Sequence, residues 1–173
     1  MANICYALHK EINEKLVEVV VVPETVVAGN VLVAETLVAG STTVYAGTKV
    51  ADITTEKPLI IIDQGFEELV DGRRPDGSNM VTGINFTVGK RVHAIRFDEN
   101  MKYEIATDVL ETSIAPAVGK FLIPQNGSLE LAVANTLGTA LVGLKIEAVT
   151  TIPVGGNVMA GFTASVIARI VLA

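Results

Sequence analysis

Glu24-Thr25-Val26-Val27-Ala28-Gly29 is repeated later in the chain as Glu35-Thr36-Leu37-Val38-Ala39-Gly40, and a weaker third copy follows as Val44-Tyr45-Ala46-Gly47. Each copy has the β-branched residues of a short strand and ends at a glycine, which accepts the positive φ that tight turns need. Turn signals at this spacing are typical of a meander, a sandwich or a barrel. The copies are too few for a solenoid.

Apolar runs and alternation predict further strands on either side of the repeat. They fall at residues 16–22, 59–62, 91–97, 103–106, 117–124, 129–133, 144–148 and 166–172. In the run 91–97, Val92, Ala94 and Arg96 share one face. The pair Asn126-Gly127 predicts a hairpin turn. Because no segment after residue 20 has a convincing helical pattern, the expected fold class is all-β, an antiparallel sandwich or a barrel-like arrangement.

The same patterns suggest how the chain is divided. We expect an N-terminal arm over residues 1–15, whose spacing of apolar residues fits either a short helix or an extended segment. A β-rich lobe with the repeat follows over 16–71, and a second β-rich lobe covers 84–173. Residues 72–83, which include the turn signal Pro75-Asp76-Gly77, are the expected loop or linker between them. The length suits one domain or two small lobes with a shared core.

The composition points to a subunit of an assembly. Half of the 173 residues are hydrophobic, the mean hydropathy is +0.49, and charged residues make up 18%, against about 25% in typical globular proteins. The surplus of apolar residues predicts burial in an oligomer or on a larger body. A net charge of −6 without a broad basic cluster argues against direct binding to nucleic acid.

Targeting segments are not expected either. The first residues have no basic region followed by an apolar one, so secretion by a signal peptide is not predicted. Residues 154–173 are apolar but contain Asn157 and Arg169, which favours a buried β-segment over a membrane span.

The sequence offers few groups for chemistry. One cysteine, Cys5, excludes an internal disulfide, and two histidines, His9 and His93, are too few for a zinc site. Nucleophile-elbow and phosphate-binding motifs are absent from the sequence. Carboxylates are plentiful at 67–68, 71, 98–99 and 108, but we interpret them as solvated turn residues, and neither 71–79 nor 98–100 has the spacing of a calcium loop. We therefore expect no enzyme activity, no metal and no cofactor.

The chain as a whole resembles the head decoration (cement) proteins of tailed bacteriophages. The resemblance lies in the glycine-punctuated strands 27–33 and 37–40, in 85–97 leading into 103–106, and in 118–127. It implies an all-β protein that binds the outside of an assembled capsid and bridges capsomers.

Several expectations follow from that resemblance. The partners would be the major capsid protein and further copies of the chain, with a trimer favoured, and the location would be the capsid exterior after synthesis in the host cytoplasm. Another self-assembling virion component, such as a shell, tail-tube or fibre-base subunit, is the main alternative, and a small-ligand-binding β-barrel is a further one. The interface residues we expect are Tyr6 and Leu8 in the N-terminal arm and Arg73 and Arg74 in the loop.

Overall fold

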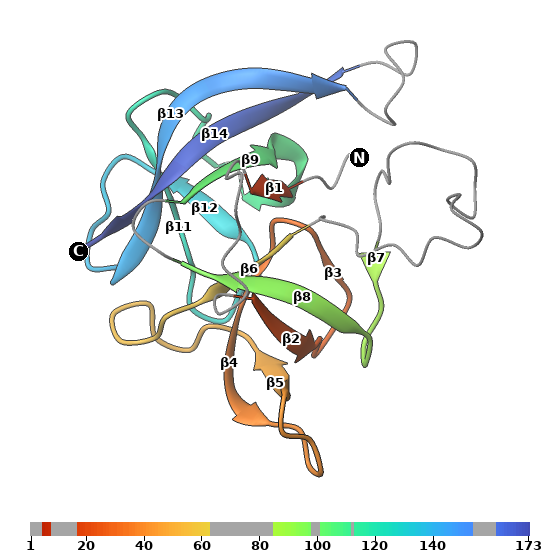
Figure 1. Ribbon diagram of the computed structural model, residues 1–173. Coiled ribbons are helices and arrows are strands. Elements are labelled where there is room, and N and C mark those ends of the chain that lie inside the picture. Colours follow the sequence, from red (N-terminus) through yellow and green to blue (C-terminus); the bar gives the residue numbers. More distant parts are fainter. Residues whose placement is uncertain (1–4, 8–16, 63–84, 98–100, 112, 154–161) are drawn as a thin grey trace.

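The computed structural model describes residues 5–7, 17–62, 85–97, 101–111, 113–153 and 162–173. These residues form a closed five-stranded barrel, a seven-stranded sheet and a two-stranded ribbon. In Figure 1 the barrel occupies the lower part of the molecule and the seven-stranded sheet the upper part. The expected all-β class is confirmed, and the one short helical turn among the described residues is the 3₁₀ turn η2 (Thr107–Val109).

The barrel closes in the order β2-β5-β4-β6-β8. Its strands are β2 (Val17–Val21), β5 (Val44–Thr48), β4 (Val31–Leu37), β6 (Leu59–Ile61) and β8 (Arg91–Arg96). Four neighbouring pairs are antiparallel, but β2 and β5 are parallel. The expectation of an antiparallel arrangement is wrong for this pair. With an odd number of strands in a closed ring, directions cannot alternate all the way round, so at least one pair must be parallel.

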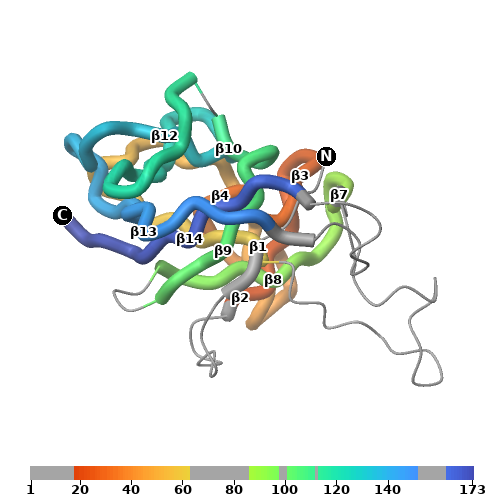
Figure 2. Tube along the Cα trace, turned by 90° about the horizontal axis from the view of Figure 1, so that it is seen from above, coloured from red at the N-terminus to blue at the C-terminus, as the bar shows by residue number. Residues whose placement is uncertain are grey.

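The seven-stranded sheet has the order β1-β9-β14-β13-β11-β12-β10. Its strands are β1 (Cys5–Ala7), β9 (Lys102–Ala106), β14 (Phe162–Leu172), β13 (Val142–Pro153), β11 (Phe121–Ile123), β12 (Leu131–Ala134) and β10 (Leu110–Glu111). β10 and β12 are parallel, a second exception to the expected arrangement. β13 and β14 form a long antiparallel hairpin with a bulge between Ile146 and Ala148, and Figure 2 shows these two strands side by side across the molecule.

Two apolar clusters hold these sheets together. The barrel interior is filled by side chains such as Val20, Leu32, Leu59, Ile61 and Val92. The second cluster joins the outer face of the barrel to the seven-stranded sheet. It includes Val31, Ile60 and Ile95 from the barrel and Tyr103, Ile105, Leu122, Leu144 and Val166 from the sheet. The apolar run 59–62 is therefore buried on both faces of its strand, which explains why it does not alternate.

The sheets do not divide the chain at the predicted linker 72–83, which lies outside the described residues. β8 lies after that segment in the sequence yet belongs to the barrel, and β1 from the predicted arm belongs to the seven-stranded sheet. After β2, the chain instead passes from the barrel to the seven-stranded sheet between β8 and β9. The rest of the predicted arm, residues 1–4 and 8–15, also lies outside the described residues.

The glycine repeat forms turns in its first two copies. In the turns 27–30 and 38–41, the N–H of the fourth residue donates a hydrogen bond to the carbonyl of the first residue. The third residue is Gly29 or Gly40, with φ of 95° and 79° respectively. This is the pattern of a type II turn. The first turn follows β3 (Val26–Val27), which pairs with β7 (Asn85–Phe86), and the second joins β4 to β5. The third copy is different, because Val44–Thr48 is strand β5 and contains Gly47.

Candidate functional site

The open end of the barrel forms a groove on the surface of the described residues. Alternation along β4, β6 and β8 carries Ala34, Leu59 and Arg96 on the face that lines the barrel interior. Leu59 pairs directly with Arg96 between β6 and β8. Arg96 thus continues the inward-facing row of Val92 and Ala94 at the point where the barrel opens to solvent. Alternation in the run 91–97 predicts that Val92, Ala94 and Arg96 share one face, and the structure confirms this prediction.

Arg96 is held at this opening by Glu18 from β2. Its Nε and Nη2 lie 2.9 Å and 2.7 Å from the same oxygen, Glu18 Oε1. The Glu18 side chain is 16% exposed and that of Arg96 is 53% exposed, so the carboxylate faces inward and the guanidinium covers it. Because a charge this far from water needs its counterion, the pair fixes the position of Arg96.

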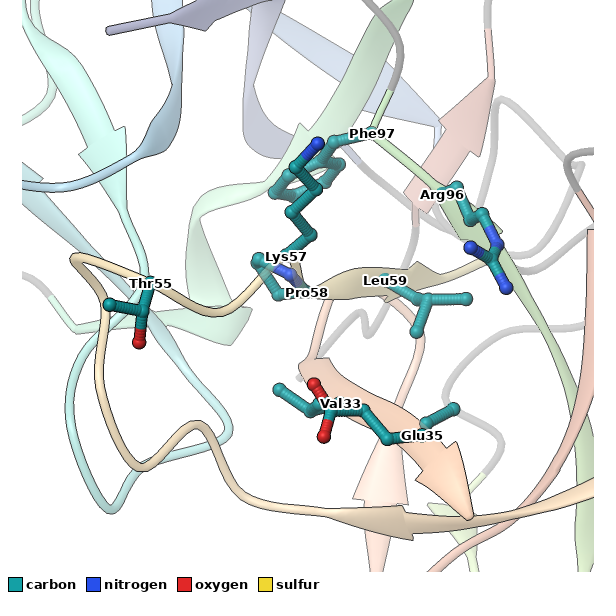
Figure 3. A pocket seen from close by; sticks show the side chains of 9 residues that line it. Val33, Glu35, Thr55, Lys57, Pro58, Leu59, Arg96 and Phe97 are labelled. Atoms are coloured by element: carbon teal, nitrogen blue, oxygen red, sulfur yellow. The ribbon is translucent and has the colours of Figure 1, made fainter. Parts of the chain in front are cut away.

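Beside this pair lies an open groove of about 460 Å³. β4, the segment before β6 and the end of β8 line it with Val33, Ala34, Glu35, Thr55, Lys57, Pro58, Leu59, Arg96 and Phe97. In Figure 3 the side chains of Arg96 and Glu35 come from opposite walls, with Leu59 between them. Pro58 and Leu59 are buried, whereas Glu35 and Lys57 are exposed.

The chemistry of the groove suits contact with another protein. It has an apolar floor and charges of both signs at the rim, which is the general layout of protein–protein interfaces. Among the described residues, Glu35 and Lys57 have no ion-pair partner. The barrel interior behind the groove is filled by side chains, so the groove offers surface contact rather than a deep binding cavity.

The expected interface residues do not lie in this groove. Tyr6 is the central residue of β1, an edge strand, where it pairs with Glu104 of β9. Leu8, Arg73 and Arg74 lie outside the described residues. Their role in an interface stays a prediction.

The other candidate groups remain dispersed. His93 lies on β8 and is half-buried. Asp108 is exposed on η2, where its Oδ2 accepts a hydrogen bond of 3.4 Å from Thr163 Oγ1. In the described ranges, no three Cys, His, Asp or Glu side chains are placed to hold a metal ion. His9 and the carboxylates at 67–68, 71 and 98–99 lie outside those ranges.

A pair of matching turns was missed in the sequence. The two turns are Thr87-Val88-Gly89-Lys90 and Ala117-Val118-Gly119-Lys120. In each, the lysine N–H donates a hydrogen bond of 3.1 Å to the carbonyl of the first residue. Gly89 and Gly119 have φ of 81° and 86°. Val88 and Val118 are both 66% exposed. The shared Val-Gly-Lys motif was the signal that could have revealed these two exposed apolar tips.

Comparisons with protein-family models, curated proteins and solved structures give no match for this chain. No helix in the described part of the chain is both long and apolar enough to cross a membrane. The candidate site therefore stands on its own geometry and on the sequence pattern.

Proposed function

We propose that this protein is a structural virion subunit that binds the outside of an assembled phage capsid and stabilises it by bridging capsomers. The resemblance of residues 27–33, 37–40, 85–97 with 103–106, and 118–127 to head decoration proteins supports the virion assignment. The observation that carries a docking role is the groove at the barrel mouth, where Leu59 and Pro58 form a floor between the charges of Glu35 and Lys57.

In this proposal the protein acts by binding and not by catalysis. A protein that binds the assembled lattice and not its free subunits stabilises the lattice by mass action. Contact with several capsomers at once raises the overall affinity through effective concentration. A homo-oligomer, with a trimer as the first expectation, would supply several grooves and would bury part of the apolar surplus. The major capsid protein is the proposed partner in the groove.

Binding to shells tests the proposal. Purified protein should sediment with expanded shells of the cognate major capsid protein and raise the temperature at which those shells fall apart. Reversal of one rim charge, Lys57→Glu, should weaken shell binding by about tenfold, since rim charges direct docking. The matched control is Lys145→Glu, an exposed lysine of β13 on another surface. Shells that are equally robust with and without the protein would refute the capsid role.

A second candidate is a virion component that assembles with itself. The edge of β13 favours it, because β11 pairs with β13 at Leu144 and Lys145, and no described strand lies beside the segment 147–153 on that side. Open strand edges can pair with another chain. Sedimentation of the protein alone separates the candidates, because self-assembly predicts large tubes or shells without any capsid, whereas a decoration protein stays a small oligomer.

A further inference from the structure

A second, smaller pocket lies away from the barrel mouth, where the first turn of the repeat meets the loop after β11. Its volume is about 280 Å³. The polar residues that line it are Glu24, Thr25, Asn30, Lys49, Ser128 and Glu130. Most of its lining is therefore able to form hydrogen bonds, in contrast to the apolar lining of most ligand pockets.

Asn30 is the unusual residue of this pocket. Its exposed fraction is 6%, and it is one of two buried polar residues in the described core. Its Oδ1 accepts a hydrogen bond of 2.9 Å from Val27 N–H, which fixes the orientation of the amide. Within the described residues, no oxygen accepts a hydrogen bond from its Nδ2. Because buried donors without a partner are rare and costly, Nδ2 indicates a hydrogen-bond acceptor that comes from outside the chain.

The charges around Asn30 restrict what that acceptor belongs to. Lys49 Nζ lies 3.0 Å from Glu24 Oε1, so these two charges offset one another. Glu130 is exposed and leaves a carboxylate at the rim, while Ser128 Oγ accepts a hydrogen bond from Glu130 N–H and keeps its own proton to donate. An anion would meet two carboxylates, and a cation would meet the Lys49 ammonium and the Asn30 donor.

Neutral hydroxyl groups satisfy both kinds of neighbour. A hydroxyl accepts from Nδ2 or Nζ and donates to a carboxylate. We propose that this pocket binds one sugar ring of a neutral saccharide, with Asn30 Nδ2 donating to a ring hydroxyl oxygen and Glu130 accepting from a neighbouring hydroxyl. The lining has no aromatic residue, so we expect weak affinity for each copy, roughly millimolar. This inference does not depend on the proposed capsid role.

Titration followed by ¹H–¹⁵N NMR tests the site directly. Glucose, galactose, mannose and N-acetylglucosamine are added in turn to the labelled protein, with inorganic phosphate and methylguanidinium as charged probes. We expect at least one sugar to shift the side-chain NH₂ signal of Asn30 and the backbone signals of 127–130. The absence of such shifts with every sugar, or larger shifts at these positions with a charged probe, would overturn the proposal.

The variant Asn30→Asp removes the Nδ2 donor but keeps the hydrogen bond that the side chain accepts from Val27 N–H in the turn. Aspartate keeps an acceptor for Val27 N–H and removes Nδ2, so sugar binding should weaken by about tenfold or more. Asn135→Asp, the same substitution at an exposed position, is the matched control and should bind the sugar as wild type does. If Asn30→Asp does not fold, Glu130→Gln and Ser128→Ala replace it, and each should weaken binding severalfold. Unchanged affinity in the folded variants would place the sugar elsewhere and refute the site.

Discussion

Arg169 donates a hydrogen bond from Nε to Glu147 Oε1 over 2.7 Å, across the hairpin of β13 and β14 and beside the bulge in β13. The second oxygen, Glu147 Oε2, lies 2.6 Å from Lys102 Nζ on β9. One carboxylate therefore joins three neighbouring strands. The hydrogen bonds from Lys102 and then Arg169 lower the pKa of Glu147 below its ordinary value of 4.5, because they stabilise its charged form.

Glu147→Gln should reveal this link as a pH-dependent loss of stability. A lowered pKa in the folded state means that the carboxylate adds stability above the unfolded value of 4.5, and that this stability is lost as the pH falls through the folded value. Wild type should therefore melt higher than Glu147→Gln at neutral pH, and the gap should close below the folded pKa. Thermal unfolding over a pH series measures it. A gap that persists in strong acid would show that packing, and not charge, is responsible.

Gly47→Ala should destabilise the barrel through crowding. A methyl group at Gly47 would lie 2.9 Å from Val20 Cγ1 and 3.0 Å from the Val21 carbonyl oxygen. Overpacking of this kind costs about 1–3 kcal/mol, which chemical denaturation can measure.

Gly40 supplies the comparison, because its φ is +79° and nothing lies within 4 Å of an added methyl. Gly40→Ala should cost about 1 kcal/mol through backbone strain alone, and Gly40→Asn should cost less, since asparagine tolerates this conformation. At Gly47 the order should reverse, with asparagine worse than alanine. The same order at both positions would contradict the distinction between crowding and strain.

Asn126 should contribute to stability by joining two loops. The pair Asn126-Gly127 predicts a hairpin turn, and β11 and β12 do form a hairpin with a turn at 125–128, where Ser128 N–H donates to the Gln125 carbonyl over 3.3 Å and Gly127 has φ of 74°. Their connection is longer, however, and Asn126 Oδ1 accepts a hydrogen bond of 2.9 Å from Ile53 N–H while Gly127 N–H donates to the Val50 carbonyl over 2.7 Å. Asn126→Ala should lower the free energy of unfolding by about 1 kcal/mol. Asn135→Ala, at an exposed position, should change it little.

Local patterns of the sequence predicted local structure well. The run 16–22 became β2, the run 103–106 lies within β9, and the alternation of Val92, Ala94 and Arg96 placed the arginine correctly. These features depend on the period of two along a strand and on glycine turns, and both can be recognised from neighbouring residues.

Strand partnership could not be predicted in the same way. Whether β8 pairs with β2 or joins β9 in the other sheet depends on contacts between residues far apart in sequence. The parallel pair in the barrel follows from an odd strand number, which no single segment reveals. The groove was missed for the same reason, because Glu35, Lys57 and Arg96 come together through closure of the barrel.

Ile60→Ala should weaken the barrel and the seven-stranded sheet together. Ile60 belongs to β6 in the barrel, yet it is fully buried in the cluster that contains Tyr103 and Leu144 of the sheet. Loss of this side chain should cost about 2–5 kcal/mol and should leave one cooperative transition, because both sheets share that core. Far-UV circular dichroism and tyrosine fluorescence should then give the same midpoint. Ile61→Ala, inside the barrel, is the control for a barrel-only cavity. If Ile60→Ala shifts one of two separate transitions, the lobes fold independently and the shared cluster does not couple them.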